Sequence, residues 1–249
     1  MTTCPFLGHE VGQGRIKPLE AKVQAIRDFP LPTKKKGVRA FLGLSGYYRR
    51  FILNYASETV ALTELTKKDK PDKITWNQTA REAFNKVKVM LTSHSILQSP
   101  NDELPFILQT DASGVGLGAV LSQEDPTQGD RPVAYFSRKL KDAETRYSAV
   151  ELECLAAVDA MRHFRVYLLG SEFTLITDNQ ALVHLKKFKN ENGRLARWAL
   201  ALQPFQFQVK HRSGTANGNA DGLSRQYEEF KADPLESKEE GEDVKEYTP

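Results

Sequence analysis

Four acidic residues stand in contexts that turn them toward the protein interior, namely Asp111, Glu153, Asp178 and Asp221. Acidic side chains normally lie at the surface, because burying an unpaired charge is costly. Converging carboxylates are tolerated where divalent cations share the site, and paired cations are a common means of cleaving phosphodiesters. The chemistry that these residue types favour is therefore metal-assisted phosphodiester hydrolysis.

Two of the acids follow apolar strand-like segments. Asp111 ends PFILQTD and precedes Ala112-Ser113-Gly114, whose small side chains leave room for a metal and a phosphate. An Asp that only starts a turn would give the same sequence pattern. Asp178 ends FTLITD, where an N-cap role is equally compatible. Asp221 lies in HRSGTANGNADGLSR, and an exposed helical Asp is its alternative. Each residue taken alone leaves both readings open.

A predicted helix from Ser148 to Leu168 offers two acids, and helical geometry separates them. At about 100° per residue, Glu153 lies about 200° around the helix from Glu151. That direction places Glu153 between Ala160 and Phe164 on the apolar side. We therefore expect Glu153 to point inward and Glu151 to be solvated beside Arg162.

His211 lies ten residues before Asp221, across a loop of Gly, Ser and Asn. A histidine in that place could shuttle protons near neutral pH, and a surface histidine is the alternative. The other histidines show no metal-ligand spacing. Gly114, Gly116 and Gly118 alternate along one strand face, which indicates close backbone packing there.

The elements that must position these residues form a mixed sheet flanked by helices. Strands are expected in PFILQTDASGVGLGAVLSQ (two strands), Pro132–Leu140, Glu172–Asp178 and Phe205–Arg212. Helices are expected over 148–168, 180–188, 193–202 and 217–225. This order of five strands and intervening helices predicts an α/β domain over 104–226.

The first hundred residues have a different pattern. A strand-like piece from Pro5 to Val11 and a helix from Leu19 to Phe29 are expected in 1–33. Residues 34–100 read as helical, with apolar residues at three- and four-residue steps over 38–52. A further helix is expected from Thr79, with Thr79 and Glu82 as a capping box.

Charge and composition narrow the class of protein. The net charge is +3, but residues 227–249 carry 9 acids and 3 lysines, so the rest carries 32 − 23 = +9. The basic body suits a polyanionic partner, and the acidic tail is predicted to be disordered. No secretory signal or membrane-spanning run is present, and two cysteines, Cys4 and Cys154, indicate neither a disulfide framework nor a zinc site. We expect an intracellular protein, cytoplasmic or nuclear or within a retroelement particle.

The motifs together resemble the ribonuclease H domain of gypsy-type LTR retrotransposon polyproteins. The matching segments are QTDASGVGLGAVLSQ, PVAYFSRKL, ETRYSAVELECLAAV, FTLITDNQAL, GRLARWALALQPFQFQVKHRSG and NGNADGLSR. They span about Pro105 to Arg225 in the family's order. The resemblance implies the ribonuclease H-like fold and cleavage of the RNA strand of RNA–DNA hybrids.

The family's acids occur in the order Asp, Glu, Asp, Asp, which maps onto Asp111, Glu153, Asp178 and Asp221. The family's mobile histidine maps onto His211. The resemblance implies two Mg²⁺ ions, with Mn²⁺ as a substitute, held by the four carboxylates. Asn179 departs from the His that many relatives carry, a position that is not a ligand. Substrate contacts are expected from Ser113, Lys186, Lys187, Arg194, Arg197, Lys210, Arg39, Arg49 and Arg50.

The upstream segments resemble what precedes this domain in the same polyproteins. Residues 1–33 resemble the end of the reverse transcriptase palm, and 34–100 the thumb and connection. The polymerase needs an Asp-Asp pair, which this sequence lacks, so we expect no DNA synthesis and a truncated element that associates with other parts of Pol. A catalytically inactive nucleic-acid-binding remnant is the alternative function. A DDE transposase is disfavoured, because its Glu comes last.

Overall fold

The computed structural model describes residues 3–93, 96–125, 129–179, 182 and 193–212. The described residues all belong to one compact unit. Within it the predicted domain boundaries near residues 33 and 100 remain predictions. No helix among the described residues is both long enough and apolar enough to cross a membrane.

The chain begins with a small antiparallel sheet. Its order is β1 (Cys4–Phe6), β2 (His9–Gly12), β3 (Arg15–Pro18) and β4 (Leu97–Gln98). The prediction of a single strand from Pro5 to Val11 was wrong, because the chain reverses between β1 and β2. Leu7 and Gly8 have φ of 43° and 76°, a left-handed turn that a continuous strand excludes.

The segment between β3 and β4 is helical, as predicted. It comprises α1 (Glu20–Arg27), α2 (Lys35–Tyr47), η1 (Arg49–Phe51), α3 (Tyr55–Glu58), α4 (Val60–Leu65) and α5 (Gln78–Thr92). Their apolar faces meet in one core that includes Ile26, Phe41, Leu62 and Val87, each fully buried. Burying a large aliphatic or aromatic side chain contributes about 1.5–3 kcal/mol, so this core stabilises the helical segment.

The start of α5 differs from the prediction. Asn77, not Thr79, is the N-cap, and its Oδ1 accepts a hydrogen bond from Ala80 N at 2.9 Å. Glu82 instead accepts a hydrogen bond from Gln78 Nε2 at 2.8 Å on the helix surface. Asn and Thr both suit an N-cap, so the sequence alone did not decide between them.

The second sheet is the five-stranded mixed sheet that the sequence predicts. Its order is β7 (Gly129–Lys139), β6 (Gly116–Asp125), β5 (Phe106–Ala112), β8 (Glu172–Thr177) and β9 (Gln206–His211). β5, β6 and β7 are antiparallel, while β5–β8 and β8–β9 are parallel. The parallel pairs bring the carboxyl ends of β5, β8 and β9 to one edge of the sheet.

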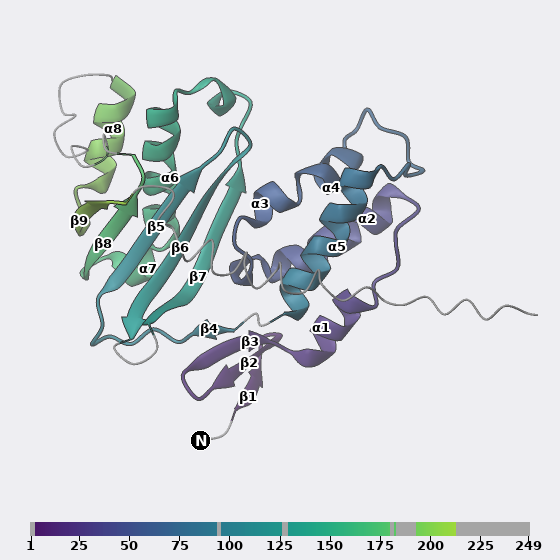
Figure 1. Ribbon diagram of the computed structural model, residues 1–249, viewed down its shortest axis with the longest axis horizontal. Helices are drawn as coiled ribbons and strands as arrows, with labels where there is room; N and C mark the ends of the chain where they lie inside the picture. The colour runs from purple at the N-terminus through teal and green to yellow at the C-terminus, as the bar shows by residue number, and fades with distance from the viewer. Residues whose placement is uncertain (1–2, 94–95, 126–128, 180–181, 183–192, 213–249) are drawn as a thin grey trace, which may run out of the picture. The chain divides into compact units, whose positions relative to one another are not determined.

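Helix α6 (Ala149–His163) packs against this sheet, followed by α7 (Arg165–Leu168) and α8 (Gly193–Leu202) (Figure 1). Leu108, Leu121 and Leu175 from the strands and Met161 from α6 are fully buried in the shared core. The predicted long helix starts correctly after Ser148 but is interrupted at Phe164. The helices predicted over 180–188 and 217–225 lie outside the described residues, apart from Leu182.

A charged clamp fixes α6 to β7 through Arg138. Its guanidinium donates to Asp159 Oδ2 at 2.6 Å and to both oxygens of Glu144, at 2.6 and 3.1 Å. Glu144 belongs to the short turn η2 (Glu144–Arg146) before α6. Burial tends to raise the pKa of Glu144, but hydrogen bonds from Arg138 and from Lys141 N outweigh it and lower the pKa. The paired charges therefore stabilise this corner.

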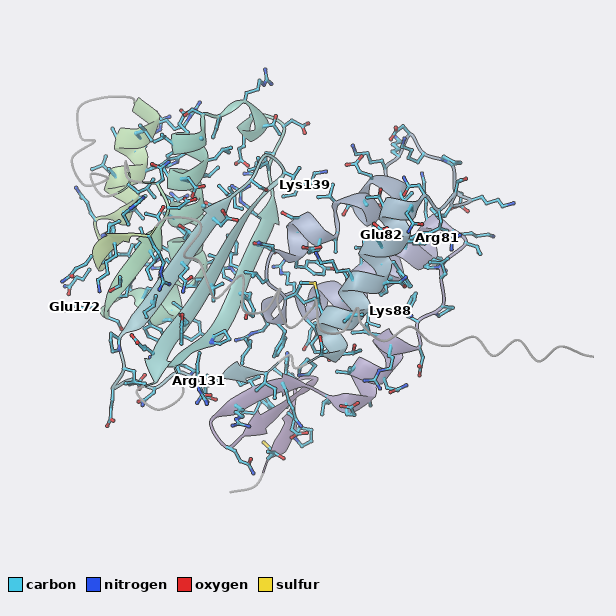
Figure 2. The ribbon with its side chains drawn as sticks, viewed as in Figure 1. Arg81, Glu82, Lys88, Arg131, Lys139 and Glu172 are labelled. Atoms are coloured by element: carbon cyan, nitrogen blue, oxygen red, sulfur yellow. The ribbon has the colours of Figure 1, made fainter. Side chains whose placement is uncertain are left out.

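Strand β7 also contacts the N-terminal elements at both of its ends. Lys139 Nζ pairs with Glu64 of α4 at 2.9 Å, and Arg131 donates to Gln98 of β4 at 2.9 Å. Figure 2 labels Lys139 and Arg131 near opposite ends of this strand. The edge of the sheet is thus covered by the chain's own preceding segment, which limits edge-to-edge pairing with other molecules.

Candidate active site

The strand-end acids lie level with each other on adjacent strands. β5 and β8 run parallel with Gln109 opposite Ile176, so Asp111 and Asp178 emerge together where the strands end. Both residues are exposed, so the prediction that they turn toward the interior was wrong: they lie at the strand ends, where the sheet stops covering them. Atoms packed around Asp111 and the neighbouring charge of Asp178 raise the pKa of Asp111. The structure thus brings together two of the four predicted carboxylates.

Glu153 reaches the same edge from α6. Its Oε1 accepts a hydrogen bond from Ala112 N at 3.2 Å, and the residue is 8% exposed. Burial, then the charges of Asp178 and Asp111, raise its pKa to about 8. The predicted inward orientation of Glu153 is confirmed.

Glu151 is not the solvated residue that we expected. It completes a capping box with Ser148, and its Oε1 accepts from Arg194 Nη1 at 2.6 Å, so its side chain is 16% exposed. The Ser-x-x-Glu spacing could have revealed the capping box from the sequence. The bond from Arg194 to Glu151 joins α8 to the start of α6, and the sequence alone could not have revealed it.

The chemistry of the three described carboxylates suits a divalent cation. Besides burial, the charge of Asp178 raises the pKa of Asp111, the charges of both raise the pKa of Glu153, and Glu153 Oε2 is buried without a hydrogen-bond partner. A cation would neutralise the repulsion and satisfy that oxygen. Among the described residues, however, no three His, Cys, Asp or Glu side chains gather as a ligand set. Asp221, the predicted fourth ligand, lies outside the described residues.

His211 ends β9 opposite Thr177. Its Nε2 lies 2.9 Å from the carbonyl oxygen of Asp178, close enough for a hydrogen bond in the tautomer that protonates Nε2. The imidazole is exposed at the same edge of the sheet as the acids. The structure therefore places His211 beside the strand-end carboxylates.

The residues near this edge that were predicted to contact nucleic acid differ in their exposure and in the bonds that they already make. Arg197 and Lys210 are exposed on α8 and β9. Arg194 pairs with Glu151 and lies over the Tyr147 ring, 4.0 Å from its centre, so it is not a free surface cation. Ser113 Oγ is held in the turn before β6 by Gly116. Lys186 and Lys187 lie outside the described residues.

The predicted arginines of the helical segment are not at the acids. Arg39 donates to Thr66 O at 3.0 Å. Arg49 and Arg50 lie within electrostatic range of His163, whose pKa is lowered by burial and then by their charges. His163 is ten residues from Glu153 along α6, or about 15 Å. These two arginines therefore lie near the opposite end of α6 from Glu153.

Comparisons with known proteins agree with this arrangement. Residues 101–205 match the family described as the RNase H-like domain found in reverse transcriptase. The chain is 46% identical over 221 residues to the retrovirus-related Pol polyprotein from transposon 297 of Drosophila melanogaster, covering 88% of this chain and 20% of the relative. It is 34% identical over 238 residues to the Tf2-3 polyprotein of Schizosaccharomyces pombe, covering 94% and 18%.

Solved structures show the same fold. The foamy viral protease-reverse transcriptase in complex with an RNA/DNA hybrid aligns with a TM-score of 0.69 at 18% identity, covering 99% of this chain and 31% of that one. The chain thus spans about a fifth of these polyproteins and a third of that structure. The chain is therefore similar along most of its length to part of the retrotransposon Pol polyproteins, and its residues 101–205 match the RNase H-like domain found in reverse transcriptase.

Proposed function

We propose that this chain is a ribonuclease that hydrolyses the RNA strand of RNA–DNA hybrids with two Mg²⁺ ions. The observation that supports it most strongly is the meeting of Asp111, Asp178 and Glu153 at one sheet edge, with a buried Glu153 oxygen that has no partner. Such a site is unfavourable by itself and becomes favourable when a cation is present.

Asp111, Glu153 and Asp178 would hold the ions, with Asp221 as a further ligand. When bound, the ions supply the Lewis acidity that activates a water and stabilises the departing 3′ oxygen. The hydrogen bond from Ala112 N holds Glu153 in place before substrate arrives. His211, anchored beside Asp178, would carry protons near neutral pH and assist product release.

The charge distribution supports a polyanionic substrate. Arg197 on α8 and Lys210 on β9 are both exposed. Residues 1–226 carry a net charge of +9, from 32 basic and 23 acidic residues. The related foamy viral enzyme forms a complex with an RNA/DNA hybrid, which makes the hybrid the first substrate to test. Each cation that contacts a phosphate should add about one unit to the salt dependence of binding.

The test is cleavage of an end-labelled hybrid by the whole chain with Mg²⁺. We expect Asp111→Asn and Asp178→Asn each to lower the cleavage rate about 10²-fold or more, because metal catalysis supplies several kcal/mol. Glu151→Gln is the matched control, since Glu151 is an acid of the same region that faces α8. Binding of the hybrid without any cleavage by the wild type would instead identify a catalytically inactive remnant.

A further inference from the structure

Three directly paired residues form a row across the sheet. Asp111 of β5 is opposite Gly118 of β6, and Gly118 is opposite Ser137 of β7. Directly opposite residues of antiparallel strands project from the same face of a sheet, with their Cα atoms about 4.5–5.5 Å apart. The carboxylate of Asp111 and the hydroxyl of Ser137 therefore flank the bare Cα of Gly118 on one face.

The start of α3 lies on this same face. Ala56 N donates to Ser137 Oγ at 3.0 Å. A Cβ added to Gly118 would overlap Asn54 Oδ1, so the Asn54 amide rests directly on Gly118. The side chain of Asn54 thus lies one strand away from Asp111, in a place that only a glycine at position 118 leaves open.

The backbone explains part of why an asparagine stands there. Asn54 has φ of 53°, in the left-handed region that Asn tolerates better than most residues. That conformation does not require the amide to be bonded, and among the described residues no group is hydrogen-bonded to it. Asn54 is half-buried, and neither of its amide atoms is among the fully buried, unpartnered polar atoms of the described residues, so the amide is not sealed from solvent. An amide offers two donors and one acceptor without adding charge.

We propose that Asn54 is a substrate-positioning residue, which donates a hydrogen bond to the sugar–phosphate backbone of the strand whose scissile phosphate lies at Asp111. Adjacent strands are about 4.8 Å apart, and successive nucleotides advance about 3.4 Å along a duplex. In this proposal the strand runs across β5 and β6, which places a neighbouring nucleotide beside Asn54 and within reach of its amide. The inference rests on the proposed function, and it assigns part of substrate binding to the helical segment outside residues 101–205.

Binding without divalent metal tests the inference separately from catalysis. Asn54→Gly keeps the left-handed backbone and removes the amide, while Asn54→Asp keeps the shape, removes both donors and adds a negative charge. We expect Asn54→Gly to raise the Kd for a labelled hybrid in EDTA about tenfold, the loss typical of one hydrogen bond to a charged group, and Asn54→Asp to raise it further because its charge repels the phosphates. With Mg²⁺, KM should rise by the same factor while kcat changes less than about threefold.

Ser57→Ala is the matched control, because Ser57 belongs to the same segment but lies over Gly116, two residues before Gly118 in β6. It should bind within twofold of wild type. Equal weakening on double-stranded DNA would assign the contact to a phosphate oxygen, and weakening on the hybrid alone would assign it to the 2′-hydroxyl.

Wild-type affinity in Asn54→Gly would overturn the inference, even if the enzyme is active. If the wild type binds the hybrid but does not cleave it, the proposed function fails, and weakened binding by the Asn54 variants still supports the contact. Urea unfolding of each variant shows whether a loss of binding merely follows a loss of fold.

Discussion

Replacing Glu153 by Gln removes the ionisation of a buried carboxyl while keeping its shape. The amide oxygen can still accept the hydrogen bond from Ala112 N, and the amide nitrogen then takes the position of the unpartnered Oε2. That nitrogen would donate toward the carboxylates of Asp111 and Asp178, which now repel Glu153. The variant should therefore fold with the same structure and lose the electrostatic conflict.

The size of the effect follows from the pKa. The pKa of Glu153 is about 8 in the fold, against 4.5 for an ordinary Glu, so folding binds its proton more tightly by about 3.5 pH units. At about 1.36 kcal/mol per unit, the upper limit is about 5 kcal/mol. Because the pKa of Glu153 is higher in the folded than in the unfolded protein, the contribution of its bound proton to the free energy of unfolding is fully present below pH 4.5. That contribution is lost as pH rises to 8.

The assay is urea unfolding of metal-free protein between pH 4 and 8.5. Wild type and Glu153→Gln should differ least near pH 4, and the variant should gain relative stability with rising pH up to a few kcal/mol at pH 8. Glu151→Gln provides the control of opposite sign. The hydrogen bond that Ser148 N donates to Glu151 is the largest cause that lowers the pKa of Glu151, so the Glu151→Gln variant should lose stability relative to wild type as pH rises through 4.5. Parallel wild-type and Glu153→Gln curves would refute this reasoning.

Three further predictions concern the supporting structure and the cation. Arg138→Gln should lower the free energy of unfolding, measured in urea, by about 3 kcal/mol because it removes the main charged partner of two largely buried acids, Glu144 and Asp159. Arg162→Gln, at a side chain 58% exposed, should change it by less than about 0.5 kcal/mol. Asn77→Ala should cost about 1 kcal/mol by the same measurement, and Thr79→Ala much less, a ranking that equal losses would contradict. At pH 8, Mg²⁺ should raise the midpoint temperature of thermal unfolding of the wild type, measured by calorimetry, and should raise that of Asp178→Asn by less. Equal shifts would exclude Asp178 as a ligand.

The elements that position the acids were predictable because they follow local patterns. Apolar runs ending in Asp marked β5 and β8, and the helical period placed Glu153 rather than Glu151 toward the interior. The close packing expected of the alternating glycines is present at Gly116 and Gly118 but not at Gly114, where an added Cβ would meet nothing within 4 Å.

What the sequence did not reveal depends on contacts between distant residues. The N-terminal hairpin is completed by β4, about eighty residues later, and its strands are too short to show a period. The Arg194–Glu151 bond spans 43 residues, and Asn54 meets Gly118 across 64. Such pairings are set by tertiary packing, which charge and spacing along the chain do not encode.

The most direct test of the central claim is Mg²⁺-dependent cleavage of a labelled RNA–DNA hybrid by the whole chain, beside Asp111→Asn. The account predicts RNA-strand cleavage by the wild type, none in EDTA, and a rate reduced about 10²-fold or more in the variant. Undiminished cleavage by Asp111→Asn would contradict it.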